Sequence, residues 1–325
     1  MEHVLCSIST RGRYETTLPL AIQAVIMQTR PPNHLIIYDD NSDAIDPRQH
    51  KVYDQLFRIM SVRGISWEWI WSGKKGQHHN HQLANEKATK WVWRVDDDCV
   101  PEPHVLETLL EHVNDRVGGV AGSCLTPTWD QSPRKVTGLI DNLDAEPNIQ
   151  WGHILHAQQV EHLHCSFLYR AHVWDYNLAL SQVAHREETL FSWHLHKLGY
   201  QLWAVPGAIT WHMKFDAGGI RTSDQAQMYA HDDAIFRNFL KYKHNTIVVL
   251  DCGMGDHVVF KHVLPKLKNP VVFSCYPDII PGFSIAQAHA EFGDISTWNI
   301  YKKMHEWRWD QSLEHAYAKL YGVKS

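Results

Sequence analysis

The stretch that decides the fold reads WVWRVDDDCVPEP, residues 91–103. It starts as an apolar run typical of a buried strand, continues with three carboxylates at Asp96–Asp98, and ends where Pro101 and Glu102 open a helical sequence. Three adjacent negative charges repel one another, and they are tolerated where a hard divalent cation shares them. A solvated acidic turn in which Asp98 caps the next helix is the alternative interpretation. The surrounding sequence has to decide between the two.

On both sides of this stretch, strand-like runs alternate with helix-like runs, which is typical of βαβ units and a mainly parallel sheet in an α/β fold. We expect strands at 4–9, 34–39, 65–71, 91–95 and 119–123, and helices at 16–28, 49–60, 80–90 and 102–113. In such a sheet, ligands bind beyond the carboxyl ends of the strands. Thr10-Arg11-Gly12-Arg13 and Asp39-Asp40 follow two of the other strands. The sequence therefore predicts that three strand ends meet in one polar site.

The pattern changes after residue 125. Residues 125–180 have the composition of long loops that cover a site. A helix is expected at 186–198, then a strand at 201–205 and a short run ending at Trp211-His212. A helix at 223–243 marks the predicted boundary between a first domain, 1–243, and a small α/β domain, 244–325.

Composition indicates a soluble globular chain. Its 325 residues are 44% hydrophobic and 21% charged, which excludes disordered and collagen-like classes. The longest apolar runs are far shorter than the roughly 20 residues of a membrane-spanning helix, and no signal-peptide pattern is seen, so we expect a cytoplasmic protein. The net charge of -5 with neutral histidines gives no basic field that would indicate nucleic acid as a partner.

Six cysteines, at positions 6, 99, 124, 165, 252 and 275, show no C-x-x-C pair and no regular spacing. This pattern argues against both a disulfide framework and a thiolate zinc site. We therefore expect reduced, buried thiols. His162 and His164 allow a weaker metal hypothesis, but a third ligand is missing.

Residues 1–215 resemble the family 2 glycosyltransferases with the GT-A fold. The resemblance rests on SISTRGRYETTLPLAIQAVIMQTRPPNHLIIYDDNSD (7–43), on the DxD-type triplet at 96–98, and on HREETLFSWHLHKLGYQLWAVPGAITWH (185–212). The last segment is similar to the family's acidic pair on a helix, its Gly-aromatic turn and a histidine after the last core strand.

The resemblance implies a nucleotide pocket lined by Thr10, Arg11 and Arg13, with Asp40 accepting a hydrogen bond from the base or ribose. The triplet would bind the ribose and the metal-diphosphate, with Asp96 and Asp98 or Asp97 and Asp98 as the working pair and Asp98 as the direct metal ligand. Mg²⁺ or Mn²⁺ suits oxygen ligands, and His212 as a further ligand would favour Mn²⁺. A purely structural role for His212 at a strand end is the alternative. Lys74, Lys75 and Gln77 are possible base or phosphate contacts.

Glu187 and Glu188 occupy the place of the family's general base, and Glu188 aligns better with the second acidic position. A base on the side of the sugar opposite the leaving diphosphate would invert the anomeric centre. One of the two acids can instead simply stabilise the helix N-terminus.

Together these features predict a metal-dependent inverting glycosyltransferase that uses a nucleoside diphosphate sugar, with a UDP-sugar as the leading candidate. The expected acceptor is a glycan or a glycolipid precursor of the lipopolysaccharide type, and a hydroxymethylated base of viral DNA is the alternative. The turn Asp251-Cys252-Gly253-Met254-Gly255-Asp256 resembles part of a heptosyltransferase-type GT-B domain, which suggests acceptor recognition or assembly. It also resembles the first motif of S-adenosylmethionine-dependent methyltransferases, so a methyltransferase and a non-catalytic sugar-nucleotide binder remain as other classes.

Overall fold

The computed structural model describes residues 2–73, 75–127, 153–214, 218–219, 225–241, 246–250, 269–274 and 282–292. The chain divides into two compact units, Met1–Tyr176 with Gln182–Ala226 and Asn177–Ser181 with Gln227–Ser325. This division falls near the start of α6 (Gln225–Lys241). The predicted domain boundary after residue 243 lies at the other end of that helix, and it stays a prediction.

In the described part of the first unit, nine strands form one sheet. The order is β3 (Ser66–Trp71), β2 (His34–Asp39), β1 (Val4–Thr10), β4 (Trp91–Arg94), β8 (Phe167–Arg170), β6 (Val117–Leu125), β9 (Gln201–His212) and β5 (Cys99–Pro101), and β7 (Gln158–Val160) also pairs with β9. The first four strands are parallel, as expected. Their carboxyl ends therefore lie at one edge of the sheet.

Three strands were not expected from the sequence. β8 runs antiparallel between β4 and β6 in the centre of the sheet, in a region predicted as long loops, and β5 and β7 pair antiparallel with β9. β9 also continues through Pro206-Gly207, where a break was expected. The pairing with β6 shifts its register there, and Gly207 takes a φ of +79°, so a bulge absorbs the proline.

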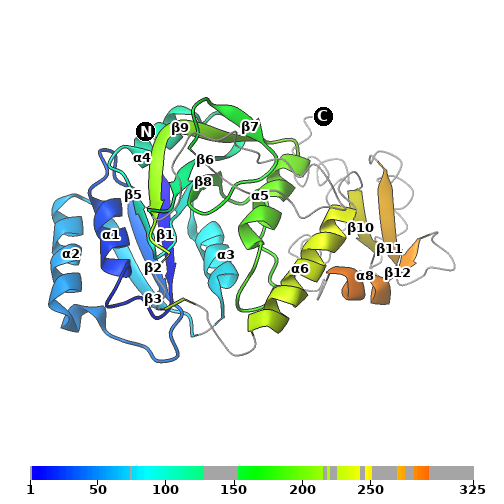
Figure 1. Cartoon of the computed structure of the whole chain (residues 1–325), viewed down its shortest axis with the longest axis horizontal. Helices are drawn as coiled ribbons and strands as arrows, with labels where there is room; N and C mark the ends of the chain where they lie inside the picture. Colours follow the sequence, from blue (N-terminus) through cyan, green and yellow to red (C-terminus); the bar gives the residue numbers. More distant parts are fainter. Residues whose placement is uncertain are drawn as a thin grey trace, which may run out of the picture. The chain divides into compact units, whose positions relative to one another are not determined.

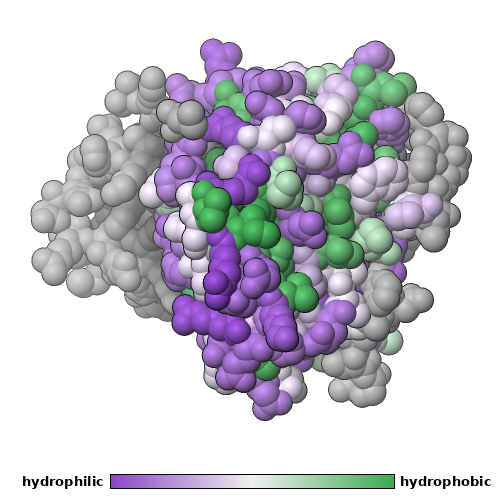
Figure 2. All heavy atoms as spheres, turned by 90° about the vertical axis from the view of Figure 1, so that its left-hand side faces the viewer, coloured by the Kyte–Doolittle hydropathy of each residue, from purple (hydrophilic) through white to green (hydrophobic). Residues whose placement is uncertain are grey.

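Alternating side chains of the strands divide the core into two layers. Val4, Cys6 and Ile8 face a layer closed by α1 (Leu18–Ile26), α2 (Lys51–Val62) and α4 (Val105–Glu111), whereas Leu5 faces a layer closed by α3 (Gln77–Lys87) and α5 (Glu187–Lys197). Figure 1 shows α1 and α2 on one side of the parallel strands and α3 on the other. On the face seen in Figure 2, hydrophobic groups are interspersed with hydrophilic ones.

The helix α3 is polar on its buried side. His78, Asn80, His81, Gln82 and Asn85 are all buried. Nδ2 of Asn80 donates to Oγ of Ser9 at 2.8 Å, and Oε1 of Gln82 accepts from the backbone N–H of Tyr176 at 2.9 Å. Hydrogen bonds therefore join α3 to its surroundings where an amphipathic helix would use apolar contacts.

The second unit contains a small parallel sheet of β10 (Thr246–Leu250), β11 (Pro270–Ser274) and β12 (Phe283–Ser284), followed by α8 (Ile285–Phe292). On α6, Asp232 is buried and accepts hydrogen bonds from the N–H and Oγ of Ser181. The predicted glycine turn at 251–256 lies outside the described residues. No helix in the described ranges has the length and apolar character needed to cross a membrane.

Buried histidines predict a loss of stability in mild acid. The ring of His81 is 1% exposed, and burial, together with the charge of Arg94, lowers its pKa well below the ordinary value. The unfolded chain binds a proton below about pH 6.5 while folded His81 stays neutral, so stability falls as the pH drops, by up to about 1.4 kcal/mol per pH unit. We expect the Tm to decrease from pH 7 to pH 5, and His81→Gln to make this decrease shallower.

The matched control is His3→Gln, because His3 is exposed. Its Tm should follow the wild-type pH dependence. Identical pH slopes for His81→Gln and the wild type would contradict the assignment.

Candidate active site

Asp97 joins the end of β4 to the end of β1. Its Oδ2 accepts hydrogen bonds from Oγ1 of Thr10 at 2.8 Å and from the backbone N–H of Arg11 at 3.2 Å, and Nε of Arg13 lies 3.2 Å from Oδ1. Burial raises the pKa of Asp97 to about 7, although the charge of Arg13 opposes this. With donors on both oxygens, Asp97 holds the loop after β1 in place.

Asp98 is held from two sides. Nη2 of Arg13 lies 3.0 Å from Oδ2, and Nε2 of His212, the last residue of β9, lies 3.3 Å from Oδ1. The backbone C=O of Asp98 also accepts from the N–H of Met213 at 2.9 Å. Asp98 and His212, which were both expected to bind the metal ion, therefore contact each other in the fold.

Asp96 belongs to a second ion-pair chain, which reaches α5. Nη2 of Arg94 lies 3.0 Å from Oδ1 of Asp96, and Nη1 of Arg94 lies 2.6 Å from Oε1 of Glu187. Nε2 of Gln77 donates to the same Oε1 at 3.2 Å. Burial raises the pKa of Glu187 to about 8 against the opposing charge of Arg94. Because the side chain of Glu187 is fully enclosed, it anchors α5 to the end of β4.

Glu188, the neighbouring acid, is in a different setting. Its Oε1 lies 3.1 Å from Nδ1 of His164, and its side chain is 16% exposed. Burial alone would raise its pKa, but the hydrogen bond and charge of His164 together with the charge of Arg94 lower the pKa of Glu188 to about 2. Glu188 is thus ionised at neutral pH and is the more accessible of the two glutamates.

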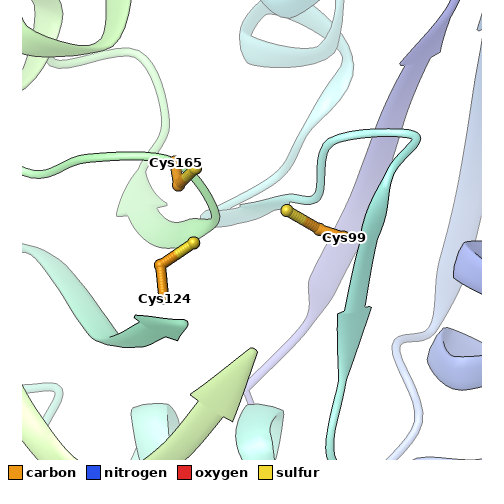
Figure 3. A group of neighbouring side chains, drawn as sticks. All are labelled: Cys99, Cys124 and Cys165. Atoms are coloured by element: carbon orange, nitrogen blue, oxygen red, sulfur yellow. The ribbon is translucent and has the colours of Figure 1, made fainter. Parts of the chain in front are cut away.

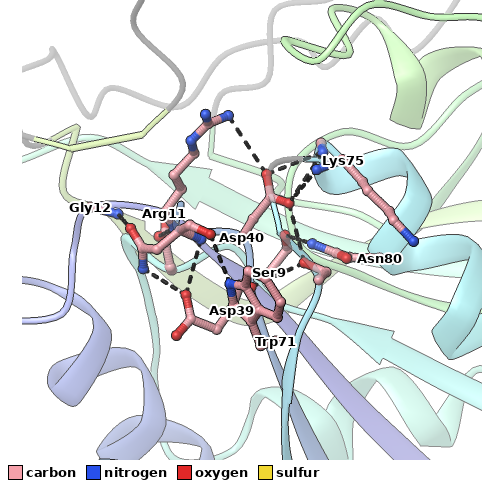
Figure 4. Close-up of polar contacts among 12 residues, drawn as sticks. Ser9, Arg11, Gly12, Asp39, Asp40, Trp71, Lys75 and Asn80 are labelled. Atoms are coloured by element: carbon pink, nitrogen blue, oxygen red, sulfur yellow. Dashed lines mark hydrogen bonds and ion pairs between the residues drawn. The ribbon is translucent and has the colours of Figure 1, made fainter. Parts of the chain in front are cut away.

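Asp40, at the end of β2, anchors the loop that precedes α3 (Figure 4). Its Oδ1 accepts from the backbone N–H of Lys75 at 2.7 Å and from Oγ of Ser72 at 3.1 Å, and Oδ2 accepts from the N–H of Gly76. Nη1 of Arg11 lies 3.7 Å from Oδ2. The structure brings Asp40 to the predicted site, while its contact with a base or ribose stays a prediction.

Two glycines allow close backbone packing between the loop after β1 and residues 218–219. Gly12 has a φ of +68° and donates its N–H to Oδ1 of Asn41. Nδ2 of Asn41 in turn donates to Oδ1 of Asp39. Gly218 has a φ of +83°, and a Cβ there would lie only 2.4 Å from the carbonyl oxygen of Gly12. Side chains at either glycine would push the two segments apart.

Four acids lie close together at the strand ends and the start of α5. Asp96–Asp98 and Glu187 share the guanidinium groups of Arg13 and Arg94 and the ring of His212. The side chain of Asp96 is 23% exposed, so this carboxylate has access to solvent. Carboxylate oxygens are the ligands that Mg²⁺ and Mn²⁺ prefer. The residues present therefore fit the divalent cation that the sequence predicts.

The structure arranges the predicted site residues in three sets of contacts, around Arg13, around Arg94 and between Glu188 and His164. It adds Arg94, to which the sequence analysis assigned no role, and it gives Gln77 and His164 partners other than the expected ones. Arg94 and Gln77 fix Glu187, and His164 fixes Glu188. Arg94 lies two residues before Asp96, and this position next to the acidic triplet was the one available signal. Lys74 lies outside the described residues.

Comparisons with known proteins show the family and the fold. The model of the family described as Glycosyl transferase family 2 matches residues 7–178. Among solved structures, S. aureus TarS 1-349 in complex with UDP-GlcNAc is 11% identical, with a TM-score of 0.48 and coverage of 74% of this chain and 73% of that one. GalNAc-T7 with UDP, GalNAc and Mn²⁺ is 12% identical, with a TM-score of 0.52 and coverage of 91% of this chain and 58% of that one. The expected α/β fold of the GT-A type is confirmed. No curated protein sequence matches the chain.

The buried pair of Arg94 and Glu187 predicts a large effect on stability. Arg94→Met would leave Glu187 enclosed without its counterion, and we expect the free energy of unfolding to fall by about 3–5 kcal/mol. Arg58→Met is the matched control, because Arg58 pairs with Asp54 on the exposed face of α2 and should cost about 0.5 kcal/mol or less. Urea unfolding of both variants measures the difference. Equal losses of unfolding free energy in the two variants would show that the buried Arg94–Glu187 pair contributes no more to stability than the exposed pair on α2.

Proposed function

Because the chain belongs to glycosyl transferase family 2, we propose that it is a metal-dependent, inverting enzyme that transfers a sugar from a UDP-sugar to an acceptor hydroxyl. The observation that carries the proposal is the joining of Asp97 and Asp98 with Arg11 and Arg13 at the carboxyl ends of β1 and β4, beside Asp96. A nucleoside diphosphate carries negative phosphates and a sugar that binds carboxylates, and this site offers both kinds of partner.

The loop after β1 is the proposed nucleotide-binding segment. Thr10, Arg11 and Arg13 are held by the carboxylates of Asp40, Asp97 and Asp98. Guanidinium groups bind phosphate oxygens in two-pronged geometry, so Arg11 and Arg13 are suited to the diphosphate once a ligand approaches. A bound UDP accompanies Mn²⁺ in GalNAc-T7, which shares the fold, and this supports UDP as the nucleotide.

Asp96 and Asp98 are the proposed ligands of the divalent cation. Asp96 has one oxygen paired with Arg94 and a side chain that is 23% exposed, which favours its part in the register in which the outer two acids of the triplet act. A bound Mg²⁺ or Mn²⁺ would offset the charge that grows on the leaving diphosphate. His212, expected as a further ligand, reaches Asp98 through Nε2 and thereby supports that carboxylate.

Glu188 is the proposed general base. It is ionised, partly accessible and oriented by His164, whereas Glu187 is enclosed and engaged by Arg94. A base needs hydrogen-bond reach to the acceptor hydroxyl, and attack from its side would invert the anomeric centre. His164, 3.1 Å from Oε1, fixes the direction in which the carboxylate points.

The acceptor is proposed as a glycan or glycolipid precursor, with the second unit serving acceptor recognition or assembly, and the reaction is placed in the cytoplasm. To test the enzyme class, the full chain is incubated with UDP-, GDP-, dTDP- and CMP-sugars and Mn²⁺, and sugar release is measured. We expect slow hydrolysis of a UDP-sugar. Stabilisation of the chain by S-adenosylmethionine alone, with no sugar nucleotide hydrolysed, would contradict the proposal.

The role of Asp98 predicts a loss of metal-dependent donor binding. UDP with Mn²⁺ should raise the Tm of the wild type by several degrees, because a ligand stabilises the state that binds it. Asp98→Asn should abolish this rise, while Asp54→Asn, on the exposed face of α2, should keep it. A full rise in Asp98→Asn would exclude Asp98 as a ligand.

The role of Glu188 predicts a separation of binding from turnover. Glu188→Gln keeps the shape of the side chain but removes its basicity, so kcat should fall by about 10²–10⁴-fold while UDP binding is unchanged. Glu111→Gln on α4 is the control, because Glu111 is exposed. If Glu188→Gln retains full turnover, the base is another residue.

A further inference from the structure

Three cysteines that are far apart in the sequence come together beside the acidic triplet. Cys99 starts β5, Cys124 lies near the end of β6, and Cys165 precedes β8. Their sulfur atoms all lie within 4.8 Å of one another, and Figure 3 shows the three thiols pointing toward a common centre. Cys99 and Cys165 are buried, and Cys124 is half-buried.

Strand register explains why these side chains meet. In the ladder between β5 and β9, Cys99 lies directly opposite His212. In the ladder between β6 and β9, Cys124 lies opposite Thr210, which is two residues before His212 and therefore on the same face of the sheet. Cys165 takes a φ of +57°, a left-handed conformation that is costly for a residue with a side chain. Three ladder positions and one strained residue thus converge on one point.

His212 supplies a fourth donor to this group. Its Nδ1 lies 3.6 Å from Sγ of Cys165. In a tetrahedral zinc site with Zn–S of about 2.3 Å and Zn–N of about 2.05 Å, a sulfur and a nitrogen ligand are about 3.6 Å apart and two sulfurs about 3.8 Å. The distance from Nδ1 to Sγ of Cys165 matches this value, and the sulfur atoms need to approach one another by at most about 1 Å. His212 is not among the residues whose ligand atoms all lie within 4.8 Å of one another, so its ring also has to move toward the other two thiols.

We propose that Cys99, Cys124, Cys165 and Nδ1 of His212 bind one Zn²⁺ ion in a closed, structural site. Three soft thiolates and an imidazole form a ligand set typical of structural zinc, and four protein ligands leave no open position for catalysis. Binding replaces the three thiol protons, which pass to solvent, by three Zn–S bonds. The site is separate from the oxygen-ligand site at Asp96 and Asp98.

The contact between His212 and Asp98 agrees with this assignment. A histidine that binds zinc through one ring nitrogen commonly donates the N–H of the other to a carboxylate, which fixes its tautomer and orientation. With Nδ1 on the zinc ion, Nε2 carries the proton and donates to Oδ1 of Asp98, 3.3 Å away. The zinc ion would therefore hold the ends of β5, β6 and β9 together and position Asp98. It does so whether or not the chain transfers sugars.

The test is the metal content of the full chain, expressed with zinc in the medium, purified without metal-affinity resin and dialysed against citrate. We expect one zinc per chain by plasma mass spectrometry. Cys124→Ser should lower the zinc content to about a tenth or less. Cys6→Ser is the matched control, because Cys6 is a buried cysteine of β1 that is not part of the cluster, and it should retain the metal.

Cobalt gives a second readout that needs no variant, in case Cys124→Ser does not fold. Co²⁺ added to the reduced, metal-free wild type should produce thiolate-to-cobalt charge transfer and the strong visible bands of a tetrahedral site, and Zn²⁺ should remove both. Wild type without zinc and without these cobalt bands would overturn the proposal. So would a folded Cys124→Ser that keeps one zinc per chain.

Discussion

The ion pairs of Arg13 with Asp97 and Asp98 are the interaction on which the site depends. Arg13 lies in the loop after β1, and the two acids follow β4, so one guanidinium group joins two strand ends that are more than 80 residues apart. Both partners are largely buried. A buried charge without its counterion costs several kcal/mol, so Arg13 and the acids fix one another's positions. Thr10, the backbone N–H of Arg11 and Nε2 of His212 contact the same two acids.

Two neighbouring glutamates show that the local surroundings determine whether a carboxylate is accessible to a substrate or only stabilises the fold. Glu187 and Glu188 begin the same helix, and each has one oxygen within 3.1 Å of a cationic or ionisable partner. Arg94 and burial enclose Glu187, whereas His164 leaves Glu188 partly accessible. A similar difference is found within the acidic triplet, where Asp97 and Asp98 are engaged on both oxygens and Asp96 is 23% exposed. Sequence adjacency alone does not distinguish such roles, because it does not reveal which partner each side chain meets.

Much of the first unit could be predicted because its parallel strands and covering helices have periodic patterns. β2 occupies the expected range, and β1, β3 and β4 differ from theirs by one residue at one end. β8 was not predicted, because the four residues Phe167–Arg170 lie in the centre of the sheet and show no alternation of apolar and polar side chains. The start of α3 was not predicted, because the buried side of this helix is polar. The cysteine cluster had no sequence signal, since its members are positioned by three strands and a left-handed turn instead of by spacing along the chain.

The central claim is that the acids at the strand ends and the arginines after β1 form one site for a metal ion and a nucleoside diphosphate. Isothermal titration of UDP into the full chain, with Mn²⁺ and again with EDTA, tests it most directly. The account predicts binding with Mn²⁺ that weakens by at least about tenfold, 1.4 kcal/mol, in EDTA. Equal affinity under both conditions, or no binding of UDP in either, would contradict it.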